Sequence, residues 1–136
     1  MSSQLKQPLV SIIVVHYRGL EMLRRCLSSI FNTDYRNYEV ILVDNGSDDG
    51  SVDVIEGLFR GRVRIIRSKV NLGFIGGNNL ALREVSSKYV VLLNNDTEVH
   101  LDWLKKLVDV AECDESVGAA MPKLLSMRDP RYFEYS

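Results

Sequence analysis

The chain has 136 residues, of which 46% are hydrophobic and 26% are charged, and its formal net charge is -1. This length fits one domain with a proper core, and the balance of charges argues against a nucleic-acid-binding protein. No apolar run approaches the roughly 20 residues that span a bilayer, and residues 1–7 lack the apolar core of a signal peptide. We therefore expect a cytoplasmic protein with at most peripheral membrane association.

Four apolar runs predict strands in the first hundred residues. Residues 9–15 and 38–43 are typical of buried parallel strands, and residues 63–67 are more polar and are expected nearer a sheet edge. Residues 89–93 form a short apolar run with two β-branched valines, which predicts a strand buried on both faces. Residues 117–121 predict a fifth strand, which would end at Pro122.

Helical patterns separate these runs. Apolar residues recur at helical spacing over residues 20–31, 52–59, 80–85 and 101–111. Strands that alternate with helices predict an α/β fold with a mainly parallel, Rossmann-like sheet in a three-layer sandwich. Cys26 and Cys113 lie on two different predicted helices and are expected to be buried free thiols.

The predicted strands end in polar residues. His16 and Tyr17, Asp44 and Asn45, residues 68–71, and Asn94, Asn95 and Asp96 each follow one of the four apolar runs. Right-handed crossovers bring the carboxyl ends of parallel strands to one edge, which is where open α/β sheets bind ligands. The sequence thus predicts a ligand site there, with His16 more typical of a structural donor than of a catalytic base.

Three familiar loop motifs can be compared with these segments. No P-loop string occurs, and the glycines at residues 73–77 have the wrong spacing for a dinucleotide fingerprint. Residues 45–50 with Glu56 match several offsets of an EF-hand loop. Asn45 stands where that loop begins with Asp, and a strand precedes it, so Asx-turn and helix-capping roles are the better explanation.

A nucleotide and a metal ion fit this predicted edge. Asp96 and its neighbouring oxygens could hold Mg²⁺ or Mn²⁺ through a ligand's diphosphate, because these ions favour one or two carboxylates together with phosphate oxygens. Asp44 could accept hydrogen bonds from a base or a ribose hydroxyl. The simpler alternative is that residues 94–97 form only a polar turn and a helix cap.

Four segments together resemble family 2 glycosyltransferases, in order and in spacing. They are residues 10–17 (VSIIVVHY), 39–51 (EVILVDNGSDDGS), 71–79 (NLGFIGGNN) and 92–98 (LLNNDTE). The variant with NNDT and GGNN is similar to the rhamnosyltransferase-like branch, which builds surface polysaccharides. The resemblance covers nearly the whole chain.

The resemblance implies a GT-A fold and a nucleotide-sugar site. It assigns the nucleoside to the loop after the first strand and to Asp44, and it makes Asp96 the metal-binding carboxylate. Asn94 takes the place of the first Asp of the Asp-x-Asp signature, and Asn78 stands where many relatives have Arg. The expected nucleotide-sugar-binding residues are Val15, His16, Tyr17, Asp44, Asn78, Asn94, Asn95 and Asp96.

The resemblance also implies the chemistry, an inverting displacement at the anomeric carbon of the donor sugar. The sugar would pass to a saccharide or lipid-linked acceptor, and the catalytic base is expected downstream of Ser136. We therefore expect residues 1–136 to be a single donor-binding domain, truncated before the acceptor half and inactive alone.

The chain could instead be a non-catalytic nucleotide- or sugar-binding module. A nucleotidyltransferase would share the α/β layout, but Arg18 and Gly19 are too little to supply the Gly-rich, basic loop that follows the first strand in that class. An exposed sheet edge would favour self-association, so the expected partners include a second copy in a homodimer.

Overall fold

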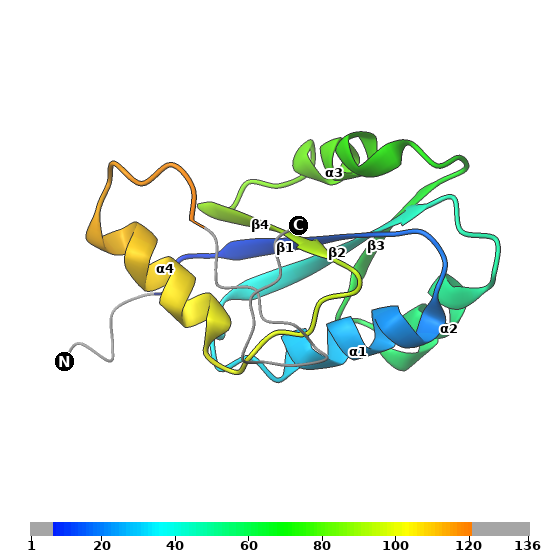
Figure 1. The fold of residues 1–136 in the computed structure, drawn as a ribbon, viewed down its shortest axis with the longest axis horizontal. Coiled ribbons are helices and arrows are strands. Elements are labelled where there is room, and N and C mark those ends of the chain that lie inside the picture. The colour runs from blue at the N-terminus through cyan, green and yellow to red at the C-terminus, as the bar shows by residue number, and fades with distance from the viewer. Residues whose placement is uncertain (1–6, 121–136) are drawn as a thin grey trace, which may run out of the picture.

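A computed structural model describes residues 7–120 of the chain. Four strands and four helices alternate along it, as Figure 1 shows. In chain order they are β1 (Val10–His16), α1 (Leu20–Phe31), β2 (Tyr38–Asn45), α2 (Ser51–Leu58), β3 (Arg64–Ser68), α3 (Gly73–Leu82), β4 (Tyr89–Asn94) and α4 (Trp103–Cys113).

The four strands form one parallel sheet in the order β3-β2-β1-β4. Strand β1 lies between β2 and β4, and β3 is at an edge, as its polar sequence predicted. Val10 pairs with Tyr38 on one side and with Tyr89 on the other. Because the three strands begin in register, they also end nearly level, and their carboxyl ends meet at one edge of the sheet.

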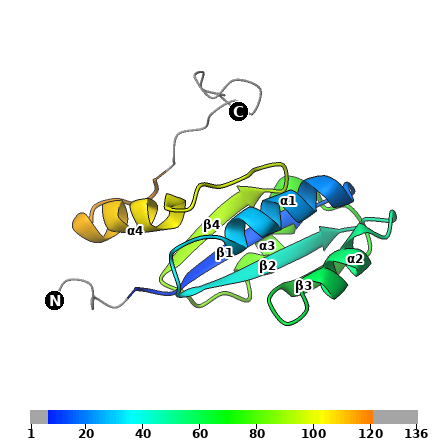
Figure 2. The ribbon, with the colours of Figure 1, turned by 90° about the horizontal axis from the view of Figure 1, so that it is seen from below.

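Helices cover both faces of the sheet. Helix α3 lies on one face, and α1, α2 and α4 lie on the other (Figures 1 and 2). Alternate residues of β1 serve the two sides: Ile12 and Val14 enter the large apolar cluster with α1, whereas Ile13 packs in a smaller cluster with Ala81 of α3. The predicted three-layer α/β architecture is confirmed.

Helix α1 illustrates how the sequence specifies these layers. Its buried residues Leu23, Cys26, Leu27 and Ile30 recur at intervals of three and four, so they form one stripe against the sheet. Glu21 lies in the first turn, where its charge is favourable next to the helix dipole. The predicted boundaries of this helix agree with the observed ones.

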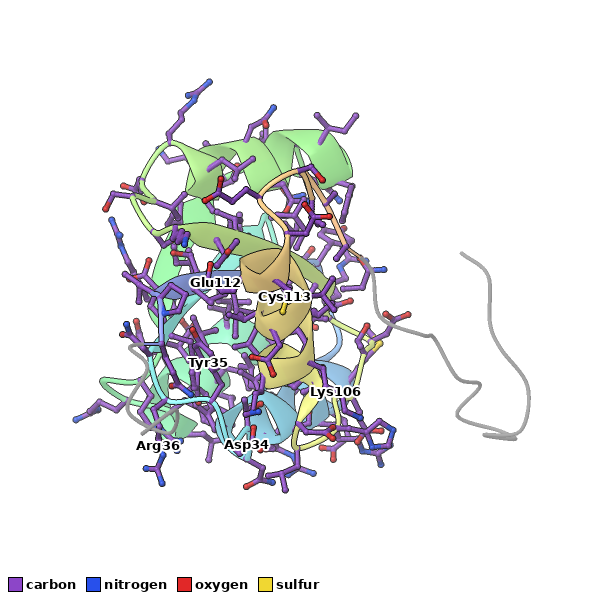
Figure 3. All side chains as sticks on the ribbon, turned by 90° about the vertical axis from the view of Figure 1, so that its left-hand side faces the viewer. Asp34, Tyr35, Arg36, Lys106, Glu112 and Cys113 are labelled. Carbon is purple, nitrogen blue, oxygen red and sulfur yellow. The ribbon has the colours of Figure 1, made fainter. Side chains whose placement is uncertain are left out.

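Helix α4 is attached at the opposite end of the sheet from the carboxyl ends of the strands. Glu112 accepts hydrogen bonds from Lys88 Nζ at 2.7 Å and from the Tyr89 hydroxyl, at the start of β4. Trp103 Nε1 donates to Thr33 Oγ1 at 2.7 Å. Figure 3 views this end of the molecule and labels Glu112 on α4. The helix therefore leaves the polar edge of the sheet uncovered.

The prediction that the fourth strand is buried on both faces is wrong. Tyr89, Val91 and Leu93 pack against the large apolar cluster, but Val90 is 37% exposed and Leu92 is 48% exposed. The reason is that β4 is an edge strand in the described part of the sheet, while α3 contacts mainly β1 and β2.

Two other predicted elements also differ from the structure. Helix α3 spans Gly73–Leu82, so the glycine-rich segment at residues 73–77 forms its first turns, and Val85 of the expected helical pattern lies beyond its end. Residues 117–120 of the expected fifth strand have no strand structure, and Met121 lies outside the described residues.

Both cysteines are free thiols on helices, as expected, but only Cys26 is buried, and Cys113 is exposed. Within residues 7–120, no helix has the length and apolar character needed to cross a membrane.

Close contact between α3 and β1 generates a prediction for Gly77. A Cβ atom at this position would lie 2.8 Å from Val15 Cγ1, and the branched Val15 side chain has little freedom to move away. We expect Gly77→Ala to lower the free energy of unfolding by about 1–3 kcal/mol through overpacking. Urea unfolding followed by circular dichroism measures this change.

Gly57→Ala is the matched control. Gly57 is also helical, but a Cβ atom added there would meet nothing within 4 Å, so alanine should stabilise α2 by about 0.5–1 kcal/mol. Equal stability of Gly77→Ala and wild type would contradict the close packing of α3 on β1.

Candidate functional site at the carboxyl ends of the strands

Register and strand periodicity together place the candidate site residues. His16 pairs with Asp44 across β1 and β2, and Val15 pairs with Asn94 across β1 and β4. His16 and Asp44 also continue the alternate positions that face α1 and α2, whereas Asn45 continues those that face α3. The polar residues that end the strands therefore lie at one edge but divide between the two faces.

The loop after β2 wraps around the turn after β1. The Arg18 N–H donates to Ser47 Oγ at 3.0 Å, and the Gly19 N–H donates to Asp49 Oδ2 at 2.9 Å. The Arg18 guanidinium binds the Asp48 carboxylate through two hydrogen bonds of 2.7 and 2.9 Å. Both Arg18 and Gly19 have positive φ angles, of 57° and 98°, which bring their N–H groups into this contact.

Contacts within the protein explain the acidic side chains of this loop, so a bound calcium ion is not needed to explain them. Asp49 Oδ1 accepts hydrogen bonds from the Ser51 hydroxyl at 2.6 Å and from the Ser51 N–H at 3.1 Å. The hydrogen bonds from Ser51 and Gly19 lower the pKa of Asp49 to about 2. Asn45, at the first EF-hand offset, accepts from the Leu72 N–H at 2.8 Å. The loop oxygens thus bind groups of the protein itself.

Asn45 also fixes the loop that leads into α3. Its amide accepts from the Leu72 N–H and donates Nδ2–H to the Gly73 carbonyl at 3.0 Å, so it contacts the loop backbone in two places. Gly46 follows with a φ of 84°, and a Cβ atom there would lie 2.8 Å from the Val70 carbonyl carbon. The absence of a side chain at Gly46 allows the two loops to pack together.

His16 connects β1 to both neighbouring loops. Its side chain is fully buried, with Nε2 2.8 Å from Ser51 Oγ and Nδ1 2.9 Å from Asn95 Nδ2. Burial lowers the pKa of His16, although the charges of Asp49 and Asp44 act in the opposite direction. Since both ring nitrogens contact other residues, the geometry agrees with the structural role expected for this histidine. A direct contact of its side chain with nucleotide stays a prediction.

Asp44 is a buried carboxylate that lies near the guanidinium of Arg67. Asp44 Oδ1 accepts from the Ser47 N–H at 2.9 Å, and Oδ2 lies 3.5 Å from Arg67 Nη1. Only 7% of the Asp44 side chain is exposed. Arg67 also binds Asp53 at 2.9 Å, so it joins β3 to α2 next to the predicted nucleoside position.

Arg67 was not predicted as a site residue, because in the sequence it belongs to a run of basic residues typical of a solvated strand. The signal that would identify it is the sheet register, which pairs it with Asp44.

Residues 94–97 form a turn after β4. The Thr97 N–H donates to the Asn94 carbonyl at 3.2 Å, and Cys26 Sγ of α1 lies 3.7 Å from the same oxygen. Asn94 and Asp96 are exposed, whereas Asn95 between them is half-buried against His16. The turn expected from the polar sequence is therefore present, and it leaves the Asp96 carboxylate accessible.

The three remaining predicted residues differ in their exposure and in their contacts. Tyr17 is 40% exposed, and the Arg18 guanidinium lies 4.8 Å from the centre of its ring. Val15 is half-buried against Gly77. Asn78 is buried in α3 and donates to the Phe74 carbonyl of its own helix at 3.0 Å. Binding of nucleotide by any of them stays a prediction.

The oxygens of this turn fit a divalent cation that is bound mainly through a ligand. Within residues 7–120, no group of three or more His, Cys, Asp or Glu residues could hold a metal ion. Asp96 does supply one exposed carboxylate, and Asn94, two residues earlier, is an exposed amide. One carboxylate with diphosphate and water oxygens is a usual environment for Mg²⁺, so Asp96 is the residue that would hold the ion.

The family model for glycosyl transferase family 2 matches residues 11–131, which include nearly all of the four segments described above. The chain belongs to this family. An uncharacterized glycosyltransferase of Haemophilus influenzae is 34% identical over 114 residues, which cover 82% of this chain and 35% of that protein. The predicted family is confirmed, and the rhamnosyltransferase-like branch stays a prediction.

Solved structures confirm the predicted GT-A fold of this family 2 chain. The mannosyltransferase PcManGT of Pyrobaculum calidifontis, in complex with GDP-Man and Mn²⁺, has a TM-score of 0.73 and 23% identity and covers 88% of this chain. S. aureus TarS 1-349 in complex with UDP-GlcNAc has a TM-score of 0.70 and 20% identity and covers 85% of this chain. The family 2 chain spans 34% and 37% of those two chains.

The buried thiol below the turn gives a testable prediction. Burial raises the pKa of Cys26 to about 12, from an ordinary 9.0, so the reactive thiolate should be about a thousandfold rarer than in an ordinary thiol. At pH 8 we expect iodoacetamide to modify the exposed Cys113 and to spare Cys26. Mass spectrometry of the intact chain should show one adduct.

Denaturation with urea is the control for this labelling, since both thiols should then react. Two adducts in the native chain would show that Cys26 is accessible and that α1 does not pack against residues 94–97 as described.

Proposed function

We propose that this family 2 chain is the donor-binding part of a glycosyltransferase. It binds a nucleoside-diphosphate sugar along the carboxyl ends of β2, β1 and β4, and the sugar passes to a saccharide or lipid-linked acceptor, in the synthesis of surface polysaccharide. The chain spans about a third of the length of the relatives described above. The acceptor-binding site and the catalytic base are therefore not assigned to residues of this chain.

The observation that carries the proposal is the separation of two carboxylates along one edge. Asp44 ends β2 and Asp96 follows β4, with β1 between these strands. Two strand spacings of about 4.8 Å separate the backbones by about 10 Å. This span suits a nucleoside at Asp44 and a diphosphate at Asp96, and the complexes of PcManGT with GDP-Man and of TarS with UDP-GlcNAc support a nucleotide sugar as the ligand.

The residues of the chain would contribute binding and orientation. Asp44 accepts a hydrogen bond from the base or the ribose, with its carboxylate oriented by Ser47 and Arg67. Asp96 holds Mg²⁺ or Mn²⁺, and the bound ion would stabilise the charge of the leaving diphosphate. The acceptor attacks the anomeric carbon, and a carboxylate base removes its proton.

A non-catalytic nucleotide-binding module is the second candidate, because it would use the same edge of the sheet. Nucleotide binding is common to both functions, so only sugar transfer by the full-length protein separates them. Family membership favours the enzyme.

Calorimetry with UDP, dTDP and GDP, each with and without Mn²⁺, tests the metal-diphosphate contact. We expect one nucleotide to bind, with an affinity that Mn²⁺ raises about tenfold or more. Asp96→Asn should remove the increase and keep metal-free binding, because the amide retains an oxygen but loses the charge that attracts the ion.

Asp109→Asn is the matched control for this experiment, since Asp109 is also an exposed carboxylate but lies on α4, paired with Lys105. It should bind as wild type does. If no nucleotide binds to the wild-type chain, the proposed function is wrong, and if Asp96→Asn keeps the Mn²⁺ effect, Asp96 is not the metal ligand.

Asp44→Asn tests the nucleoside contact separately. Asparagine keeps an oxygen for the Ser47 N–H but removes the charge, so we expect nucleotide affinity to fall about tenfold, equally with and without Mn²⁺. Asp53→Asn removes another carboxylate that binds Arg67 and should leave affinity unchanged. Equal losses in the two variants would indicate that the arrangement around Arg67, and not the Asp44 carboxylate, determines binding.

A further inference from the structure

We propose that His16 is a positioning residue, which holds Asn95 inward and thereby presents Asn94 and Asp96 to the ligand. The inference rests on the proposed function for its consequence, but its structural basis can be tested without any ligand. Four side chains carry it, and we refer to their hydrogen bonds as the Asn95–His16–Ser51–Asp49 chain.

Asp49 determines which group donates and which accepts in each of these hydrogen bonds. Hydrogen bonds lower the pKa of Asp49 to about 2, so at neutral pH its carboxylate can only accept. Ser51 Oγ lies 2.6 Å from Asp49 Oδ1, and its single proton must point to that oxygen. Towards His16 Nε2, at 2.8 Å, the Ser51 oxygen is therefore an acceptor.

The tautomer of His16 follows from the role of Ser51. Nε2 must carry a proton in order to donate to Ser51 Oγ. The ring is neutral because burial lowers its pKa, which leaves Nδ1 without a proton and able only to accept. Asn95 Nδ2, at 2.9 Å, is then the donor, so the orientation of the Asn95 amide is specified as well.

The position of Asn95 determines the direction in which its two sequence neighbours point. Exposure alternates along the turn, with Asn95 half-buried and both Asn94 and Asp96 exposed. Holding Asn95 inward through His16 therefore directs Asn94 and Asp96 outward. Cys26 supports the same turn from below, through its contact with the Asn94 carbonyl.

The chain of hydrogen bonds also connects three loops that the sheet register alone does not hold together. Asp49 accepts from the Gly19 N–H after β1, Ser51 begins α2 after β2, and Asn95 follows β4. A fully buried ring with both nitrogens engaged is poorly placed to act as a catalytic base. It is well placed to transmit the position of one loop to the next.

Nitrogen NMR of the ¹⁵N-labelled chain tests the tautomer directly. Long-range ¹H–¹⁵N spectra at neutral pH should show a proton on Nε2 of His16 and none on Nδ1. His100→Gln assigns the signals, because the chain has two histidines and His100 is exposed. A proton on Nδ1, or on both nitrogens, would overturn the proposal, whatever the chain binds.

Substitutions at His16 test the consequence for the ligand. Asparagine can place an acceptor near the Nδ1 position, whereas glutamine reaches only towards Ser51. Mn²⁺ should raise the affinity of wild type for UDP, dTDP or GDP. We expect this factor to be about tenfold or more smaller in His16→Gln, because changes in groups that orient metal ligands usually have effects of this size. His16→Asn should recover the increase in part.

Asn95→Ala provides a second variant that leaves the buried strand β1 unchanged. It should lose the same Mn²⁺-dependent increase while its circular dichroism spectrum stays that of the folded chain, although its melting temperature falls because the buried His16 Nδ1 loses its donor. If Asn95→Ala and folded His16→Gln keep the full effect of Mn²⁺, positioning by His16 is wrong, although the proposed function stands. If the wild-type chain binds no nucleotide, both the proposed function and the proposed effect of His16 on ligand binding are wrong. The NMR spectra test the tautomer of His16 in either case.

Discussion

The register of β1 with its two neighbours is the constraint on which the site depends. Strand β1 is buried between β2 and β4, so its hydrogen bonds decide which side chains meet at the carboxyl edge. In the observed register, His16 lies beside Asp44 and faces the same side as α1 and α2. A slip of one residue would turn His16 to the α3 face and separate it from both Ser51 and Asn95.

Much of this arrangement could be predicted from the sequence, because it follows from simple periodicities. The apolar runs identify β1 and β2, and their alternation with amphipathic helices requires a parallel sheet with its strand ends together. The burial of His16 could also be predicted, since His16 lies on the same face of the strand as Ile12 and Val14, whose side chains enter the core. The three segments that span strand ends, together with residues 71–79 before and within α3, were sufficient to indicate the family.

Other features could not be predicted, because they depend on neighbours that are remote in the sequence. The apolar run of β4 resembles a strand covered on both sides, yet Val90 and Leu92 are exposed where α3 does not reach. Arg67 becomes a site residue only through its register with Asp44. The acids at positions 48 and 49 look available in the sequence, but they hold the turn at Arg18 and Gly19.

The two carboxylates at this edge differ in a way that suits two different ligands. Asp44 is buried and is oriented by Ser47 and Arg67, as recognition of a base or ribose requires, because a directional hydrogen bond gains from a fixed acceptor. Asp96 is exposed, and the neighbouring Asn95, bound to His16, anchors the turn that carries it. A cation such as Mg²⁺, which keeps much of its water, needs that open access. Under the proposed function, recognition and metal binding impose opposite demands on burial, and two strands separated by β1 would meet them.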